Sequence, residues 1–271
     1  MKRFALPRTG IAAVASVLSL ALATGCSDSG SGSGDGDKAA GTKEPAVAGK
    51  ALSSTELEKL IVATKDVDGY EVTPATDSDA FASSKEKVKV VEEKCAPIAY
   101  VLTGFAPGDS ASYLNRQVLP TTSSTEPSPS SSLSLEDTSD ALTDALNSTM
   151  TIVSLSSYEG EGAQETLAAV SDAVEGCAGG FSATANGETE KFTKVASAKA
   201  SGSGDESVAF TVTVDAEGDE VPVKGEVVRH GSTVATYYAI SLAALAGEGG
   251  ASIADYEIPA EIIKAQAAKL G

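Results

Sequence analysis

The sequence has no tryptophan and little of several other residue types: one histidine, two methionines, three cysteines and 5% aromatic residues. We therefore expect a core built mainly from valine, leucine, isoleucine and alanine. Zinc sites draw on histidine and free cysteine, so the shortage of both argues against one. Any Ser-His-Asp or Cys-His mechanism would have to use His230. This histidine lies beside Gly231 in a predicted hairpin turn. Histidine tolerates positive φ, and this structural role is enough to explain its presence there.

Motifs that carry chemistry are also missing. The serines stand in neither GxSxG nor SxxK, and the glycine pairs form neither GxGxxG nor a P-loop. Two acidic fragments, DVDG at Asp66–Gly69 and DGD at Asp35–Asp37, resemble parts of a calcium loop but do not continue into its full pattern. A pair of catalytic carboxylates remains open among 38 acidic residues, although nothing singles out a pair. We expect no enzyme, no metal site and no cofactor.

What is present begins with an export signal. Three basic residues lie within the first eight positions, and a nearly uninterrupted apolar stretch follows from Ile11 to Ala23. This stretch is too short to span a bilayer, which needs roughly 20 apolar residues. The small residues at positions 23–25 resemble the lipobox of bacterial lipoproteins, in which the next residue, here Cys26, is diacylated and becomes the new N-terminus. We expect residues 1–25 to be a lipoprotein signal peptide.

One position departs from the usual lipobox. The leucine common at the third position before the cysteine is here Ala23, and Leu22 stands one place early. The alternative is an ordinary cleaved signal peptide that leaves Cys26 as a free or paired thiol. Residues 26–50 are rich in glycine, serine and aspartate and have no apolar periodicity, which is typical of a flexible tether. A lipid at Cys26 would hold the protein on the extracytoplasmic face of the cell membrane.

The charge is strongly negative. The formal net charge is −18, and removing residues 1–25 takes away three basic residues and no acidic ones, so the mature chain carries about −21. Such a chain is not drawn to nucleic acid or to an anionic membrane surface by its charge. We expect the lipid anchor to be its link to the membrane, and an unknown envelope ligand or protein to be its partner.

Two further cysteines, Cys95 and Cys177, lie in the expected extracytoplasmic domain, residues 51–271. In an oxidising compartment we expect them to form a disulfide. Closing a loop of about 80 residues contributes on the order of 4 kcal/mol in the chain-entropy model. The alternative is two independent buried thiols.

The first half of this domain predicts two helices. Residues 53–70 combine a serine or threonine cap, early glutamates and an apolar face, which is typical of a helix that Gly69 ends. A second helix is expected over residues 83–105, with Pro97 either kinking it or opening a new helix. Its apolar face would contain Val88, Val91, Cys95, Ile98 and Leu102.

A loop rich in serine, threonine and proline is expected at about residues 120–140, and it could equally be a linker between two domains. After it, Met150–Tyr158 has the β-branched content of a strand. Residues 163–177 predict a helix with one apolar stripe that includes Cys177.

The C-terminal half predicts an antiparallel meander of about four strands, over residues 192–200, 207–215, 221–230 and 232–241. A last helix is expected from Pro259, with Ile262, Ile263, Gln266 and Leu270 along one side. Helices before and after an antiparallel sheet predict a single α+β domain.

Three strand residues could take part in binding. Tyr237 and Tyr238 are adjacent in a strand and so point to opposite faces. One of them could line a cleft, although a core tyrosine beside an ordinary sheet tyrosine is the simpler interpretation. Arg229 could recognise an anion, but a solvated charge at a strand end is simpler.

The order of these segments resembles the extracellular sensor domain of mycobacterial-type serine/threonine kinases, a module that also occurs on actinobacterial lipoproteins. The resemblance spans roughly Leu52 to Leu270. It rests on LSSTELEKLIVATKDVDGYEV, CAPIAYVLTGF, AVEGC and VVRHGSTVATYYA. It implies a non-catalytic, cleft-bearing binding module that faces the outside, and it specifies no ligand residue. That family commonly has two disulfides, whereas Cys95 and Cys177 can supply only one.

Three kinds of function follow from these observations. The first is a membrane-anchored lipoprotein with a sensor-like domain that binds a ligand or partner in a shallow polar cleft. The second is a carrier of a lipid or other hydrophobic molecule, which predicts an apolar cavity of several hundred Å³ between sheet and helices. The third is an envelope hydrolase, which predicts two carboxylates that face each other in a pocket; with no pocket at all, a protein scaffold would be favoured.

Overall fold

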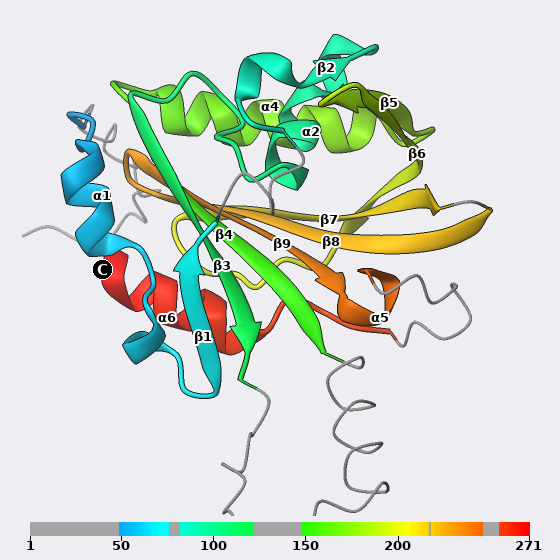
Figure 1. The fold of residues 1–271 in the computed structure, drawn as a ribbon. Coiled ribbons are helices and arrows are strands. Elements are labelled where there is room, and N and C mark those ends of the chain that lie inside the picture. Colours follow the sequence, from blue (N-terminus) through cyan, green and yellow to red (C-terminus); the bar gives the residue numbers. More distant parts are fainter. Residues whose placement is uncertain (1–48, 76–81, 122–147, 217, 246–254) are drawn as a thin grey trace, which may run out of the picture. The chain divides into compact units, whose positions relative to one another are not determined.

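The computed structural model describes residues 49–75, 82–121, 148–216, 218–245 and 255–271. Within these residues nine strands form one antiparallel sheet in the order β1-β3-β4-β9-β8-β7-β6-β5-β2 (Figure 1). The strands are β1 (Tyr70–Pro74), β2 (Lys89–Val90), β3 (Ser112–Pro120), β4 (Thr149–Ser157), β5 (Phe181–Ala185), β6 (Glu188–Ala198), β7 (Glu206–Ala216), β8 (Asp219–His230) and β9 (Thr233–Ser241).

The α-helices of the described residues are α1 (Ser54–Leu60), α2 (Ala96–Leu102), α4 (Gly162–Gly176), α5 (Leu242–Leu245) and α6 (Ala260–Leu270). Helices around an antiparallel sheet confirm the predicted α+β class. None of these helices is long and apolar enough to cross a membrane. Cys26, the tether up to residue 48, Asp35–Asp37 and most of the loop at about 120–140 lie outside the described residues.

The predicted meander is confirmed as β6 to β9, which pair in sequence. The predicted strand Met150–Tyr158 is β4, which pairs with β9 and places the meander in the middle of the sheet. The strands β1, β2, β3 and β5 were not predicted. In β3 most residues are half-buried, so the alternation of polar and apolar side chains that marks a strand is weak there.

The predicted role of His230 in the turn is wrong. His230 is the last residue of β8 and pairs with Thr233, so the hairpin turn consists of Gly231 and Ser232. Gly231 has φ of 60°, whereas Asn186 is the one non-glycine residue with positive φ in the described part of the chain. Glycine, which has no Cβ, takes the left-handed position, and His230 keeps strand geometry.

The helix predicted from Ser53 is confirmed as α1. Its N-terminus is a capping box: the Glu56 backbone N–H donates to Ser53 Oγ at 3.4 Å, and the Ser53 backbone N–H donates to Glu56 Oε2 at 2.8 Å. The helix ends at Leu60, well before Gly69, because Ile61 already has extended backbone; a short 3₁₀ turn, Thr64–Asp66, follows.

The continuous helix predicted over residues 83–105 is wrong. Two 3₁₀ turns, Lys85–Lys87 and Glu93–Cys95, flank β2, and the α-helix begins only at Ala96. Pro97 explains the break, because its ring excludes a helix that continues from the preceding turn but fits the first turn of a new one. Val91, which was expected on the buried face, is 75% exposed.

Two hydrophobic cores lie on opposite faces of the sheet. Helices α2 and α4 pack on one face against residues such as Ile152, Phe210 and Tyr238, and helices α1 and α6 pack on the other against Val153 and Tyr237 (Figure 1). The two adjacent tyrosines therefore do point to opposite faces, as predicted, but both are buried. The predicted helix over residues 163–177 is α4.

A disulfide joins Cys95 and Cys177, as predicted, with their Cα atoms 5.9 Å apart. Cys95 closes the 3₁₀ turn before α2 and Cys177 caps the C-terminus of α4, so the bond connects the two helices of one core. The predicted last helix is α6, where Pro259 is the N-cap rather than the first helical residue.

Candidate ligand-binding groove

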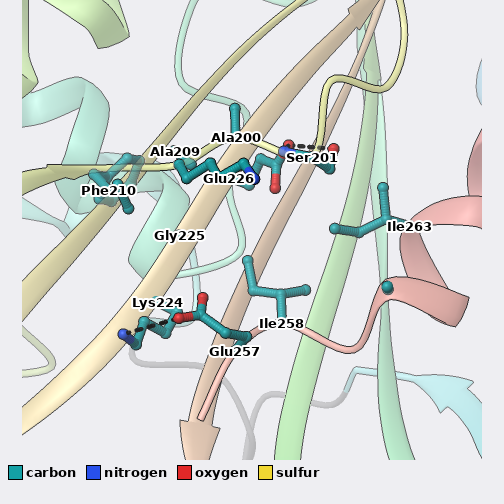
Figure 2. A pocket seen from close by; sticks show the side chains of 13 residues that line it. Ala200, Ser201, Ala209, Phe210, Lys224, Gly225, Glu226, Glu257, Ile258 and Ile263 are labelled. Atoms are coloured by element: carbon teal, nitrogen blue, oxygen red, sulfur yellow. Dashed lines mark hydrogen bonds and ion pairs between the residues drawn. The ribbon is translucent and has the colours of Figure 1, made fainter. Parts of the chain in front are cut away.

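A hollow lies between α6 and the segment that joins β6 to β7, residues 199–205. It is a pocket of about 480 Å³ whose floor is formed by β7 and β8 (Figure 2). A second hollow of about 410 Å³ continues it along α6 and shares Ser201, Ala260 and Ile263 with it. We call the two together the groove.

A buried carboxylate lies in the floor of the groove. Glu226 is in the middle of β8, between Ala209 on β7 and Tyr237 on β9, and is only 4% exposed. Its Oε1 accepts two hydrogen bonds from Ser201, one from the backbone N–H at 2.9 Å and one from Oγ at 2.5 Å. Among the described residues nothing donates a hydrogen bond to its other oxygen, Oε2. Ser201 therefore holds one oxygen of this carboxylate, and the other oxygen receives no hydrogen bond from the described residues.

Ser201 is held in place by the segment that contains it. The Ser203 backbone N–H donates to Ser201 Oγ at 3.2 Å, which closes a small turn around the serine. Gly204 has φ of 67° and lies so close to β8 that a Cβ there would be 2.4 Å from the Arg229 carbonyl oxygen. The Asp205 backbone N–H then donates to that same oxygen at 2.8 Å. Asp205, two residues after the small turn at Ser201–Ser203, thus attaches the segment to β8.

Arg229 reinforces this attachment. Its guanidinium lies 3.0 Å from Asp205 Oδ2 and 3.1 Å from Glu206 Oε2. The same Asp205 oxygen accepts the Gly231 backbone N–H at 2.7 Å. Arg229 is therefore paired with two carboxylates of its own chain. This pairing argues against the alternative prediction that Arg229 recognises an anion.

The opposite wall of the groove is the segment before α6. Lys224 Nζ lies 3.7 Å from Asp255 Oδ1 and 3.6 Å from Glu257 Oε1. Its ammonium also lies 5.9 Å from the centre of the Tyr256 ring, and the Tyr256 hydroxyl donates to the carbonyls of Pro222 and Ala239. Beyond these contacts, Ile258 and Ile263 give the wall an apolar surface (Figure 2).

Tyr237 lies next to Glu226 on the same face of the sheet. Its hydroxyl is buried and has no hydrogen-bond partner within the described residues. Burial, and to a lesser extent the negative charge of Glu226, raises the pKa of the phenol well above its ordinary value. The phenol is therefore neutral at physiological pH and can only act as a hydrogen-bonding group.

The other face of the sheet contains a smaller cavity of about 150 Å³ between the end of α2 and the meander. Its walls are almost entirely apolar, with Phe192, Val223 and Tyr238 among the lining residues. The volume of this cavity is below the several hundred Å³ that the carrier hypothesis predicts for a lipid.

The remaining sequence candidates lie elsewhere. His230 is half-buried outside the groove; its Nε2 has no partner in the described part of the chain, and burial lowers its pKa. Asp66 accepts hydrogen bonds from the Ala63 backbone N–H at 2.9 Å and from Lys269 Nζ at 2.7 Å. No cluster of three or more histidine, cysteine or acidic side chains that could hold a metal is found in the described ranges.

Sequence reasoning missed Glu226 and Ser201. The signal for Glu226 was one acidic residue within the valine-rich strand VPVKGEVVRH. An acidic residue on a buried strand face needs a partner. The signal for Ser201 was weaker, because a serine among glycines is typical of any surface loop.

No family model matches the chain, and no curated protein matches it. Among solved structures, it is similar to the extracellular domain of PknH from Mycobacterium tuberculosis, with 12% identity, a TM-score of 0.47, and coverage of 82% of this chain and 95% of that one. It is also similar to a putative uncharacterized protein, the Rv0999 ortholog, from Mycobacterium smegmatis, with 9% identity, a TM-score of 0.32, and coverage of 75% and 90%.

Proposed function

We propose that this chain is a lipoprotein, anchored through Cys26 to the extracytoplasmic face of the cell membrane, whose α+β domain binds a ligand in the groove without catalysis. The lipobox-like residues before Cys26 and the polar tether after it support the anchor. The disulfide between Cys95 and Cys177 supports an oxidising compartment. The domain is then a sensor-like binding module held away from the membrane by its tether.

The observation that carries the binding role is the buried carboxylate of Glu226 in an open pocket of about 480 Å³. Pockets of roughly 300–1,000 Å³ with a few fixed polar groups are typical of small-molecule sites. Here Ser201 fixes Glu226 from one side, so the polar group is held in a defined orientation before any ligand arrives. The buried carboxylate in the floor favours the polar-cleft hypothesis over the lipid carrier, whose expected cavity is apolar.

The groove also favours binding over hydrolysis. A two-carboxylate hydrolase needs a second carboxyl group that faces the first across the substrate. The other acid that lines the pocket, Glu257, is directed to Lys224 instead. Glu226 therefore serves as a single hydrogen-bond acceptor and negative charge.

The anchor and the binding role are tested separately. We expect the wild-type protein in the membrane fraction and the Cys26→Ser variant in the medium, with Ser27→Ala as a matched control that stays in the membrane. Membrane retention of Cys26→Ser would contradict the anchor. Native mass spectrometry of Cys26→Ser, purified from its own host, tests the cargo. A bound lipid would contradict the polar-cleft proposal and support the carrier.

A further inference from the structure

The charge of Glu226 is the starting point. Burying a carboxylate costs several kcal/mol unless hydrogen bonds and an opposite charge compensate it. In the described residues Glu226 receives hydrogen bonds from Ser201 alone, and no lysine or arginine lies within salt-bridge distance of it. The nearest cation along its own strand face, Lys224, is engaged by Asp255 and Glu257. The described residues therefore supply no donor to Oε2, and a ligand in the open groove could supply one.

The residues around this carboxylate limit which chemical groups could donate a hydrogen bond to Oε2. Ala200 and Ala209 leave space beside Glu226, and Ile258 and Ile263 face that space from the α6 side (Figure 2). A group that fits must present hydrogen-bond donors and positive charge to Oε2 and an aliphatic surface to the isoleucines. An ammonium group on an alkyl chain has both properties, whereas an anion would be repelled and an alcohol would leave the charge unpaired.

We infer that the groove binds a small molecule that carries a primary ammonium group on an aliphatic chain, with Glu226 accepting the N–H donors. This inference rests on the proposed role of the groove as the ligand site. Ser201 holds the carboxylate in place, and Ile258 and Ile263 pack on the alkyl chain. Glu257 and Asp255 pair with Lys224 in the floor. Lys199 and Lys264 also line the groove and have no ion pair within the described residues, so the ammonium group must reach Glu226 away from them.

The test compares three probes of the same chain length: pentylammonium, 1-pentanol and pentanoate. Each is titrated into the ¹⁵N-labelled full-chain Cys26→Ser variant, and amide chemical shifts are followed. We expect pentylammonium to shift the amides of Ser201, Glu226 and Ile263, with an affinity at least tenfold above that of 1-pentanol. Pentanoate should shift none of them.

Three variants assign the effect to the carboxylate. Glu226→Gln keeps the size of the side chain and an acceptor for Ser201, and it should lower the affinity for pentylammonium to that for 1-pentanol. Ala209→Leu fills the pocket and should weaken both probes at least tenfold. Glu220→Gln is the matched control: Glu220 is an exposed carboxylate at the start of β8, outside the groove, and its loss should change the affinity for pentylammonium less than threefold. Dispersed amide spectra show that each variant is folded.

The outcomes separate this inference from the proposed function. Equal affinities of the wild-type groove for pentylammonium and 1-pentanol would overturn the ammonium assignment and leave the groove as a binding site. Full binding of pentylammonium to a folded Glu226→Gln variant would overturn it as well. Shifts outside the groove alone, or no shifts with any probe, would overturn both the assignment and the role of the groove. Membrane fractionation would test the anchor independently.

Discussion

Gly225 on β8 lies directly opposite Phe210 on β7, and the phenylalanine ring occupies the space where a side chain at Gly225 would be. A Cβ built on Gly225 would lie 2.5 Å from Phe210 Cε2 and Cζ. Phe210 is fully buried in the core that contains α2 and α4. Glycine next to Glu226 thus leaves room for the ring of Phe210 to lie across β8.

Gly225→Ala should destabilise the protein by about 1–3 kcal/mol, because the new methyl group overlaps the buried ring and the core is packed too tightly to yield. Urea unfolding would measure the change. Gly179→Ala is the matched control, since nothing lies within 4 Å of a Cβ at that position. In the background Phe210→Leu the added cost of Gly225→Ala should fall; an unchanged cost would contradict the clash as the cause.

Loss of the disulfide should destabilise the domain by about 2–5 kcal/mol, because the unfolded chain regains the freedom of a long loop. The double variant Cys95→Ala, Cys177→Ala, compared with Cys26→Ser as the parent, would show this as a lower urea midpoint. In the unreduced, denatured parent a thiol reagent should label neither cysteine. Strong labelling of both would support the alternative of two independent thiols.

Tyr237, which is buried, and Tyr256, which is half-buried, should respond differently to loss of the hydroxyl. Tyr237→Phe removes an OH group that has no partner in the described structure, so stability should stay the same or rise by about 1 kcal/mol. Tyr256→Phe removes an OH that donates to two carbonyls, so it should cost about 0.5–1.5 kcal/mol. A loss of similar size in both variants would indicate that Tyr237 has a partner after all.

The sequence predicts those parts of the fold that depend on neighbouring residues. The capping box of Ser53 and Glu56, the alternation along β7 and the turn glycine Gly231 are local patterns, and α1 and the β6 to β9 meander follow from them, although the turn itself lies one residue later than predicted. The segment before Pro97 shows the limit: its apolar spacing favours a helix, but the chain instead forms two 3₁₀ turns and the short strand β2, which pairs with β5. Here a partner distant in the sequence decides the local structure.

The groove could not be predicted for the same reason. Ser201 and Glu226 are 25 positions apart and meet only because β6, β7 and β8 pair in one register. The wall opposite them comes from residues 255–263, which reach this face through α6 and its preceding segment. Cysteine pairing was predictable despite a separation of 82 residues, because chemistry and compartment limit the choice of partners.

Asp66 should make the stability of the domain depend on pH in the acid range. The hydrogen bond from Lys269 is the main cause that lowers its pKa below the ordinary 3.8, and the Ala63 backbone N–H adds to it. Because the folded-state pKa is lowered, the carboxylate stabilises the fold above the unfolded-state pKa, and this contribution is lost as the pH falls through the folded-state pKa. Asp66 ties the turn before β1 to α6, which forms one wall of the groove.

The variant Asp66→Asn lacks the charge and should therefore be less stable than the wild type at pH 7 and pH 5. The difference should shrink below pH 3.8 as the wild-type carboxylate also becomes neutral. Urea unfolding at a series of pH values would measure it, with Asp68→Asn as the control: Asp68 is exposed, and its loss should change the stability at pH 7 by less than about 0.5 kcal/mol. A deficit in Asp66→Asn that persists unchanged to pH 2 would show that the hydrogen-bond geometry of Asp66, and not its charge, attaches α6 to the turn.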